Sequence, residues 1–143
     1  MSANSTLLAS LTLQVQDNEN SGQTIVNRQV PQFSFQAVQS PYASYVTVQP
    51  GASAIVLVAS PLLAHFFYVR NATTPTTILS QYILQVGWQD SLFVVTNAVA
   101  LVPGGLIMLG NQNINNSSGS FTQLNISAPT NDNPVVAEFL YAT

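Results

Sequence analysis

The chain lacks cysteine and has almost no basic side chains. Among its 143 residues there are two arginines, no lysine and one histidine. The absence of cysteine excludes a disulfide framework, thiolate-bound zinc and thiol catalysis. A groove for nucleic acid and a polybasic membrane patch both need several cations close together. We therefore expect neither nucleic acid nor a membrane as a partner.

Groups that could carry out acid–base chemistry are also scarce. Asp17 and Glu19 fall in a polar loop, and Asp90 and Asp132 fall in sequences typical of turns, where aspartate caps backbone N–H groups. The single histidine, His65, lacks a nucleophile motif around it, so we interpret it as structural or interfacial. The acidic loops supply oxygen ligands but not the spacing of an EF-hand, so we interpret them as polar turns rather than calcium sites. We predict a protein that is not an enzyme and has no catalytic residue, metal or cofactor.

Most polar side chains of this chain are uncharged. Only 5% of the residues are charged, against about 25% in ordinary globular domains. Asn, Gln, Ser and Thr together make up 53 of the 143 residues, while 47% of the chain is apolar. That apolar content excludes intrinsic disorder. A surface with little charge favours association, so the composition predicts a subunit packed against copies of itself or a partner.

Two apolar stretches, 53–69 and 92–110, have the length of membrane spans. Ser60 and Pro61 interrupt the first, and Pro103 with two glycines interrupts the second. Neither is flanked by the basic residues that orient a span. We interpret both as buried strands, and we expect no signal peptide, because residues 1–10 lack a basic region and a long apolar core.

Turn sequences recur every eight to twelve residues, which is typical of an all-β sandwich or barrel. Residues 7–16 alternate apolar and polar side chains with the period of a half-buried strand. The whole chain, 1–143, is predicted to form a single antiparallel β-sandwich of about 8–10 short strands in Greek-key or jelly-roll-like order. Residues 1–6 and 111–119 are expected to be flexible or ordered only by a partner.

Two segments depart from the simple alternation of a half-buried strand. Residues 54–59 are apolar on both faces, which predicts a central strand covered on both sides. Residues 76–88 fit both a helical stripe and a strand face. Their β-branched residues and the β-rich context favour a strand.

The strand edges carry little protection against pairing. Residues 29–69 and 91–131 contain no formal charge, and soluble β-proteins ordinarily place lysine or inward-pointing charges on edge strands. We therefore expect neighbouring subunits to occupy the edges in the working state. The N-terminal strand, 7–16, is either an edge strand of its own domain or pairs with a neighbour.

Aromatic side chains are enriched at protein interfaces. Phe33, Phe35, Tyr42 and Tyr45 lie in charge-free strands and are the predicted interface residues.

Glu138 is the one acid inside an apolar strand. A period of two places it on the same face as Val136 and Leu140. It either reaches solvent at an edge or forms a structural ion pair with Arg28 or Arg70, the only two cations.

Three stretches resemble small virion proteins of bacteriophages: VTVQPGASAIVLV at 46–58, ALVPGGLI at 100–107 and VAEFLYA at 136–142. Such proteins are also short, β-rich, cysteine-free and poor in lysine. The resemblance implies a head decoration, cement or auxiliary capsid protein with a jelly-roll-like fold, often a trimer. Its partners would be copies of itself and the major capsid protein or other virion proteins. It would reside in the virion, after assembly in the host cytoplasm.

The first hypothesis is thus a non-enzymatic capsid decoration subunit. A phage tail or baseplate component fits the same features. A carbohydrate-binding β-sandwich is an alternative, with Trp88, Tyr82 and Tyr42 as a stacking platform. A self-assembling extracellular filament subunit is another.

Overall fold

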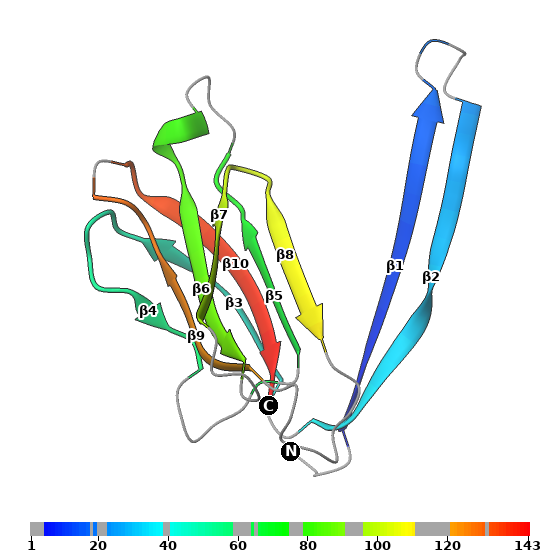
Figure 1. Ribbon diagram of the computed structural model, residues 1–143, viewed down its shortest axis with the longest axis horizontal. Coiled ribbons are helices and arrows are strands. Elements are labelled where there is room, and N and C mark those ends of the chain that lie inside the picture. The colour runs from blue at the N-terminus through cyan, green and yellow to red at the C-terminus, as the bar shows by residue number, and fades with distance from the viewer. Residues whose placement is uncertain are drawn as a thin grey trace.

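A computed structural model describes residues 5–17, 19, 23–38, 41–58, 64, 66–74, 79–90, 96–110, 121–130 and 132–143. The predicted all-β class is confirmed, since the described residues form two packed antiparallel sheets of four strands each (Figure 1). The strands are β1 (Ser5–Asp17), β2 (Gln23–Val38), β3 (Pro41–Val48), β4 (Ile55–Val56), β5 (Phe66–Asn71), β6 (Leu84–Asp90), β7 (Thr96–Leu101), β8 (Leu106–Gly110), β9 (Phe121–Ser127) and β10 (Val135–Ala142).

The eight strands of the sandwich pair in a nested way. The first sheet has the order β3-β10-β5-β8, and the second has the order β4-β9-β6-β7. Within them β3 pairs with β10, β4 with β9, β5 with β8, and β6 with β7, all antiparallel. The first strand of the sandwich thus meets the last, the second meets the second-last, and so on inward to β6 and β7.

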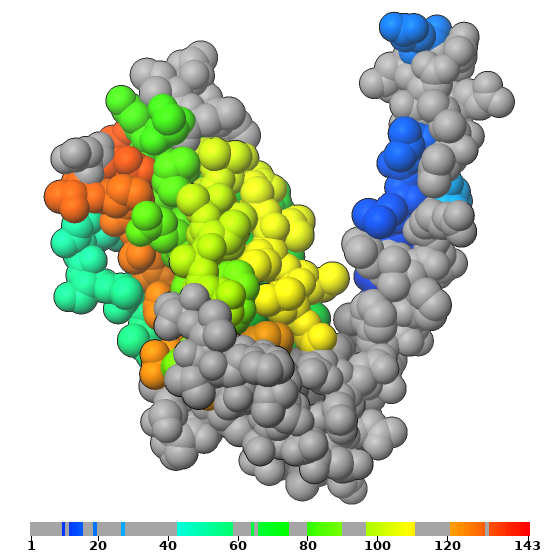
Figure 2. Space-filling view, viewed as in Figure 1, coloured from blue at the N-terminus to red at the C-terminus, as the bar shows by residue number. Residues whose placement is uncertain are grey.

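The first two strands belong to neither sheet. β1 and β2 form a long antiparallel hairpin, here called the arm, which stands apart from the sandwich (Figure 1). A hollow separates the arm from the side of the sandwich where β8 lies (Figure 2). The N-terminal strand therefore pairs with β2 of its own chain rather than with a neighbour, and it is an edge strand of the arm instead of the sandwich.

Pro31 marks an irregularity within the arm. The register passes from Ala9 opposite Phe33 to Leu11 opposite Val30, so β2 has one residue more than β1 at this point. Proline has no N–H to donate and is tolerated at bulges and on edge strands. β2 continues through Pro31 as one 16-residue strand.

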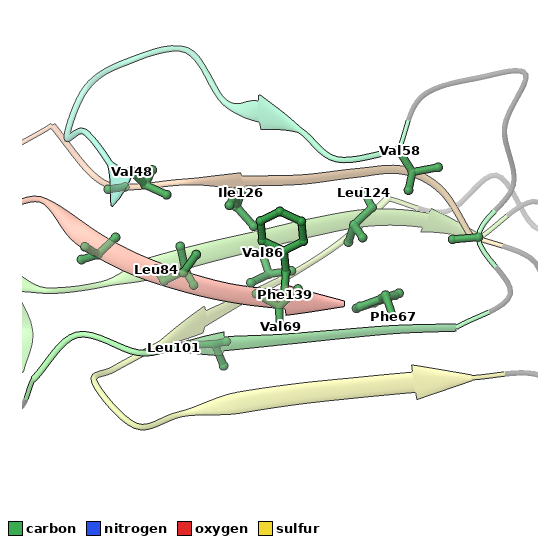
Figure 3. Packing of buried hydrophobic residues seen from close by; sticks show 14 of the residues in the cluster. Val48, Val58, Phe67, Val69, Leu84, Val86, Leu101, Leu124, Ile126 and Phe139 are labelled. Carbon is green, nitrogen blue, oxygen red and sulfur yellow. The ribbon is translucent and has the colours of Figure 1, made fainter. Parts of the chain in front are cut away.

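The core lies between the two sheets (Figure 3). Alternate residues of β10 point inward, so Val135, Ala137 and Phe139 are buried while Glu138 lies between them on the outer face. Phe67 is fully buried. Its ring centroid lies 5.1 Å from that of Phe121, in an edge-on arrangement, and 5.7 Å from that of Trp88. Apolar burial in this layer stabilises the contact between the sheets.

Two predictions about individual strands were wrong. Residues 54–59 do not form a central strand, because β4 is two residues long and lies at the edge of the second sheet, with Val56 exposed. Leu57 and Val58 both donate to the carbonyl of Leu124, an irregular pairing beside Gln123, whose φ is 52°. Within this apolar run Val58 is buried in the core, but Val56 is exposed, so the strand is not covered on both faces.

Residues 76–88 are divided rather than wholly strand. Leu79–Gln81 form a 3-10 turn, and β6 begins only at Leu84; residues 75–78 lie outside the described part. Backbone hydrogen bonds explain the late start of the strand. Asn133 N donates to Gln81 O, and Ile83 N donates to the carboxylate of Asp132 at 2.9 Å.

Residues 87–90 belong to β6, so the turn predicted around Asp90 does not begin before this strand ends. A Cβ at position 87 would lie 2.8 Å from Asn125 Oδ1, so the glycine makes room for a side chain of the neighbouring strand β9. Asp90 therefore belongs to a strand end, whereas Asp132 does bind a backbone N–H, that of Ile83.

Asn71 joins the two sheets where the chain crosses between them. It ends β5 and is fully buried. Its Nδ2 donates to the carbonyls of Tyr82 and Leu101, at 2.8 Å each, and its Oδ1 accepts from Thr73 N. Its backbone N–H donates to the carbonyl of Gly105, and its backbone carbonyl accepts from Gly104 N, both in the turn from β7 to β8. All polar atoms of this side chain are thus bonded within the protein.

No helix among the described residues is long and apolar enough to cross a membrane.

Replacing Asn71 with alanine should lower the free energy of unfolding by about 3 kcal/mol, since the buried carbonyl of Leu101 and the part-buried carbonyl of Tyr82 would lose their donors. Urea denaturation followed by Trp88 fluorescence measures the change. Asn133→Ala is the control, because it removes only one exposed hydrogen bond of 3.4 Å and should cost less than about 0.5 kcal/mol. Equal midpoints for the two variants would contradict the role given to Asn71.

Candidate functional site

A polar row crosses the outer face of the first sheet. Cross-strand register places Tyr45 of β3 opposite Glu138 of β10, Glu138 opposite Arg70 of β5, and Arg70 opposite Leu106 of β8. All four side chains point outward because outer and inner residues alternate along each strand. The row therefore brings the one acid within a strand interior next to a cation and a phenol.

The carboxylate of Glu138 is held by its neighbours. Tyr45 Oη donates to Oε1 at 3.0 Å, and Tyr68 Oη, from β5, donates to Oε2 at 3.3 Å. Arg70 Nη1 lies 3.7 Å from Oε2. The Arg70 and Glu138 side chains remain 47% and 27% exposed, so this ion pair contributes little to stability and mainly positions the groups.

The pKa of both tyrosines lies above the usual 10.0. For Tyr45 the hydrogen bond to Glu138 is the largest cause, followed by the negative charge of that carboxylate. For Tyr68 partial burial is the largest cause, and the charge of Glu138 comes next. Both phenols therefore stay protonated and keep donating throughout the neutral range.

These residues surround a shallow hollow of about 510 Å³. Tyr45, Tyr68 and Glu138 line it, together with Ala43 and Leu140 from the next cross-strand row. Two of the lining residues, Tyr68 and Leu140, also pack against a small cluster of Phe66 and Ala142. The hollow thus combines polar groups of the row with apolar lining from Ala43 and Leu140, a combination typical of ligand sites.

The arm is the second candidate surface. Thr12, Leu13, Gln14 and Val15 are consecutive residues of β1, and all four are exposed. Leu13 and Val15 remain 54% and 53% exposed. Consecutive strand residues point to opposite faces, so neither face of the arm is covered along this stretch.

The four predicted interface residues fall on two elements. Phe33 and Phe35 lie in β2 of the arm, opposite Ala9 and Leu7, and Tyr42 lies in β3 opposite Tyr141. The side chains of Phe33, Phe35 and Tyr42 lie outside the described part of the structure. Tyr45 is described and is 65% exposed.

Of the two candidate cations for Glu138, the structure places Arg70 beside it. Arg28 belongs to β2 in the arm, opposite Leu13, and its side chain is outside the described residues, as is His65.

The proposed stacking platform of Trp88, Tyr82 and Tyr42 is not assembled around Trp88. That ring packs against the core beside Phe67, and Tyr82 is a partly buried neighbour of the same core. The ring of Trp88 is therefore partly buried against the core and does not stand out as an exposed stacking surface.

Sequence reasoning missed Tyr68. Its alternation with the buried Phe67 and Val69 already places it on the same face as Arg70. What the sequence did not provide was the register that sets β5 beside β10.

Among the described residues no three His, Asp or Glu side chains gather in a way that could hold a metal ion. Comparisons with protein-family models, curated proteins and solved structures find no match to this chain.

Glu138→Gln should lower the pKa of Tyr45 and Tyr68 towards 10.0, because the variant removes the negative charge beside both hydroxyls. In the wild type the contribution of these groups to stability is fully present below pH 10 and is lost as the pH rises through their raised values. Tyrosinate absorbance during alkaline titration measures the shift. Glu19→Gln, an exposed acid in the turn of the arm, should leave the titration unchanged. Superimposable curves for Glu138→Gln and the wild type would contradict the network.

Proposed function

We propose that the chain is a non-enzymatic structural subunit of a virion, a capsid decoration protein that associates with copies of itself and with the capsid. The observation that carries the proposal is the arm, which leaves the sandwich and exposes both of its faces. An isolated two-stranded hairpin is marginally stable in water, and three or more strands with an apolar face are ordinarily needed. A partner that covers the arm in the working state would supply the contacts that an isolated hairpin lacks.

The size of the arm suits a specific interface. At about 3.4 Å per residue, the 13 residues of β1 extend over about 44 Å. Two strands about 4.8 Å apart form a ribbon about 10 Å wide, which offers about 440 Å² on each face. The two faces together supply about 900 Å², close to the 800 Å² or so that each partner contributes to a stable protein–protein interface.

The partner of the arm is a second copy of the chain. Residues 5–16 of the arm carry no charge, and neither do residues 91–131, which include the edge strands β7 and β8. Contact through β1 would therefore bury no unpaired charge, provided that Arg28 of β2, which lies opposite Leu13, stays in solvent. Exchange of identical arms around a symmetry axis closes an oligomer without leaving a free arm. A trimer is the state that the resemblance to phage decoration proteins favours.

The strand pairing supports a jelly roll. Eight strands in two sheets, with the first paired to the last and each following pair nested within it, form one long double strand rolled into a sandwich. This architecture recurs in viral capsid domains and in lectins, although a fold by itself does not determine function.

The double substitution Leu13→Asn and Val15→Asn should shift the native mass from a closed oligomer towards the 15.3 kDa of one chain. It removes apolar contacts from one face of the arm while the sandwich is unchanged. Light scattering of the purified full chain over a concentration series measures the mass.

The matched control is Thr12→Asn with Gln14→Asn, which places the same residue on the opposite face of the arm without removing a large apolar group. It should retain more of the oligomer than the Leu13 and Val15 variant. A wild-type chain that stays monomeric at all concentrations would overturn the proposal, and mass that grows without limit would favour the filament alternative.

A further inference from the structure

We propose that the hollow around Tyr45, Tyr68 and Glu138 binds a neutral saccharide. This inference concerns the outer face of the first sheet and stands independently of the arm. It rests on three properties of the described residues: an exposed aromatic ring, a pre-oriented set of hydrogen-bonding groups and a balance of charge.

Tyr45 supplies the stacking surface. It is 65% exposed on β3, at the edge of the first sheet, and its hydroxyl is anchored on Glu138 at 3.0 Å. The negative face of an aromatic ring attracts weakly positive C–H groups, such as those on one side of a pyranose. Because the anchor already restricts the ring, less conformational freedom is lost on binding.

The hydrogen-bonding groups match those of sugar hydroxyls. Each tyrosine donates its single proton to Glu138, so its oxygen remains able to accept. A carboxylate offers about four acceptor positions, and the two hydroxyls occupy one each. Arg70 does not line the hollow, but its guanidinium, 47% exposed and 3.7 Å from Glu138 Oε2, supplies donors beside it. A ligand that both donates and accepts can satisfy this set.

The charges of Arg70 and Glu138 oppose each other at 3.7 Å, so the row has no excess charge to attract an ion. Leu140 provides an apolar surface within the same hollow. A volume of about 510 Å³ lies within the range of small-molecule sites. A neutral polyhydroxylated ligand fits these features better than a phosphate, a carboxylate or a cation.

The experiment titrates the isotopically labelled full chain with cellohexaose, maltohexaose and chitohexaose, and follows amide chemical shifts. At least one of these should shift the signals of Tyr45, Tyr68 and Glu138. Tyr45→Ala should weaken that binding about tenfold, the loss expected for one aromatic stacking contact. Tyr45→Phe, which keeps the ring and loses the hydroxyl, should weaken it less.

Leu106→Ala is the matched control, since this exposed leucine lies in the same cross-strand row but outside the hollow. It should bind as the wild type does. Trp88 fluorescence reports whether each variant keeps its core. The proposal is overturned if none of the three saccharides shifts the signals at millimolar concentration, or if folded Tyr45→Ala binds as tightly as the wild type.

Discussion

The packing of the two four-stranded sheets around Phe67 is the contact on which the rest of the structure depends. Phe67 lies between the sheets and meets Trp88 and Phe121 of the opposite one. Because inward and outward residues alternate, this packing also decides what each strand presents to solvent. Strands β5 and β10 bury Phe67, Val69 and Phe139 on their inner face. The residues between these, Arg70 and Glu138 among them, therefore point outward and form the row from Tyr45 to Leu106.

A chain with few charges has few side chains that prevent its edge strands from pairing with other molecules. The sandwich and the arm of this chain differ in how their apolar residues are covered. The sandwich buries its apolar residues internally. Asn71, at the end of β5 in the first sheet, donates its uncharged amide to the carbonyl of Leu101 in the second sheet and to that of Tyr82. The arm has no such partner within the described part of the chain, and it exposes Leu13 and Val15. The proposed structural subunit, whose arm would be covered by association, is consistent with both observations.

The all-β class could be predicted from the sequence because alternation and turn spacing are local signals. The edge position of β4, the strand through Gly87 and the 3-10 turn before β6 could not, because each depends on a distant segment: Leu124, Asn125 and Asn133. The same limit applies to the site. Glu138 stood out as an acid in an apolar strand, but its choice of Arg70 over Arg28 and its bond to Tyr68 depend on strand order.

The proposal that this chain decorates a capsid is tested most directly on the particles themselves. Cells that carry the gene would be induced to release phage, and the purified particles would be labelled with gold-conjugated antibody against the chain and viewed by electron microscopy. The account predicts label distributed over the head surface. Particles without label, with the chain free in the lysate, would contradict a virion role, and label confined to tails would contradict head decoration.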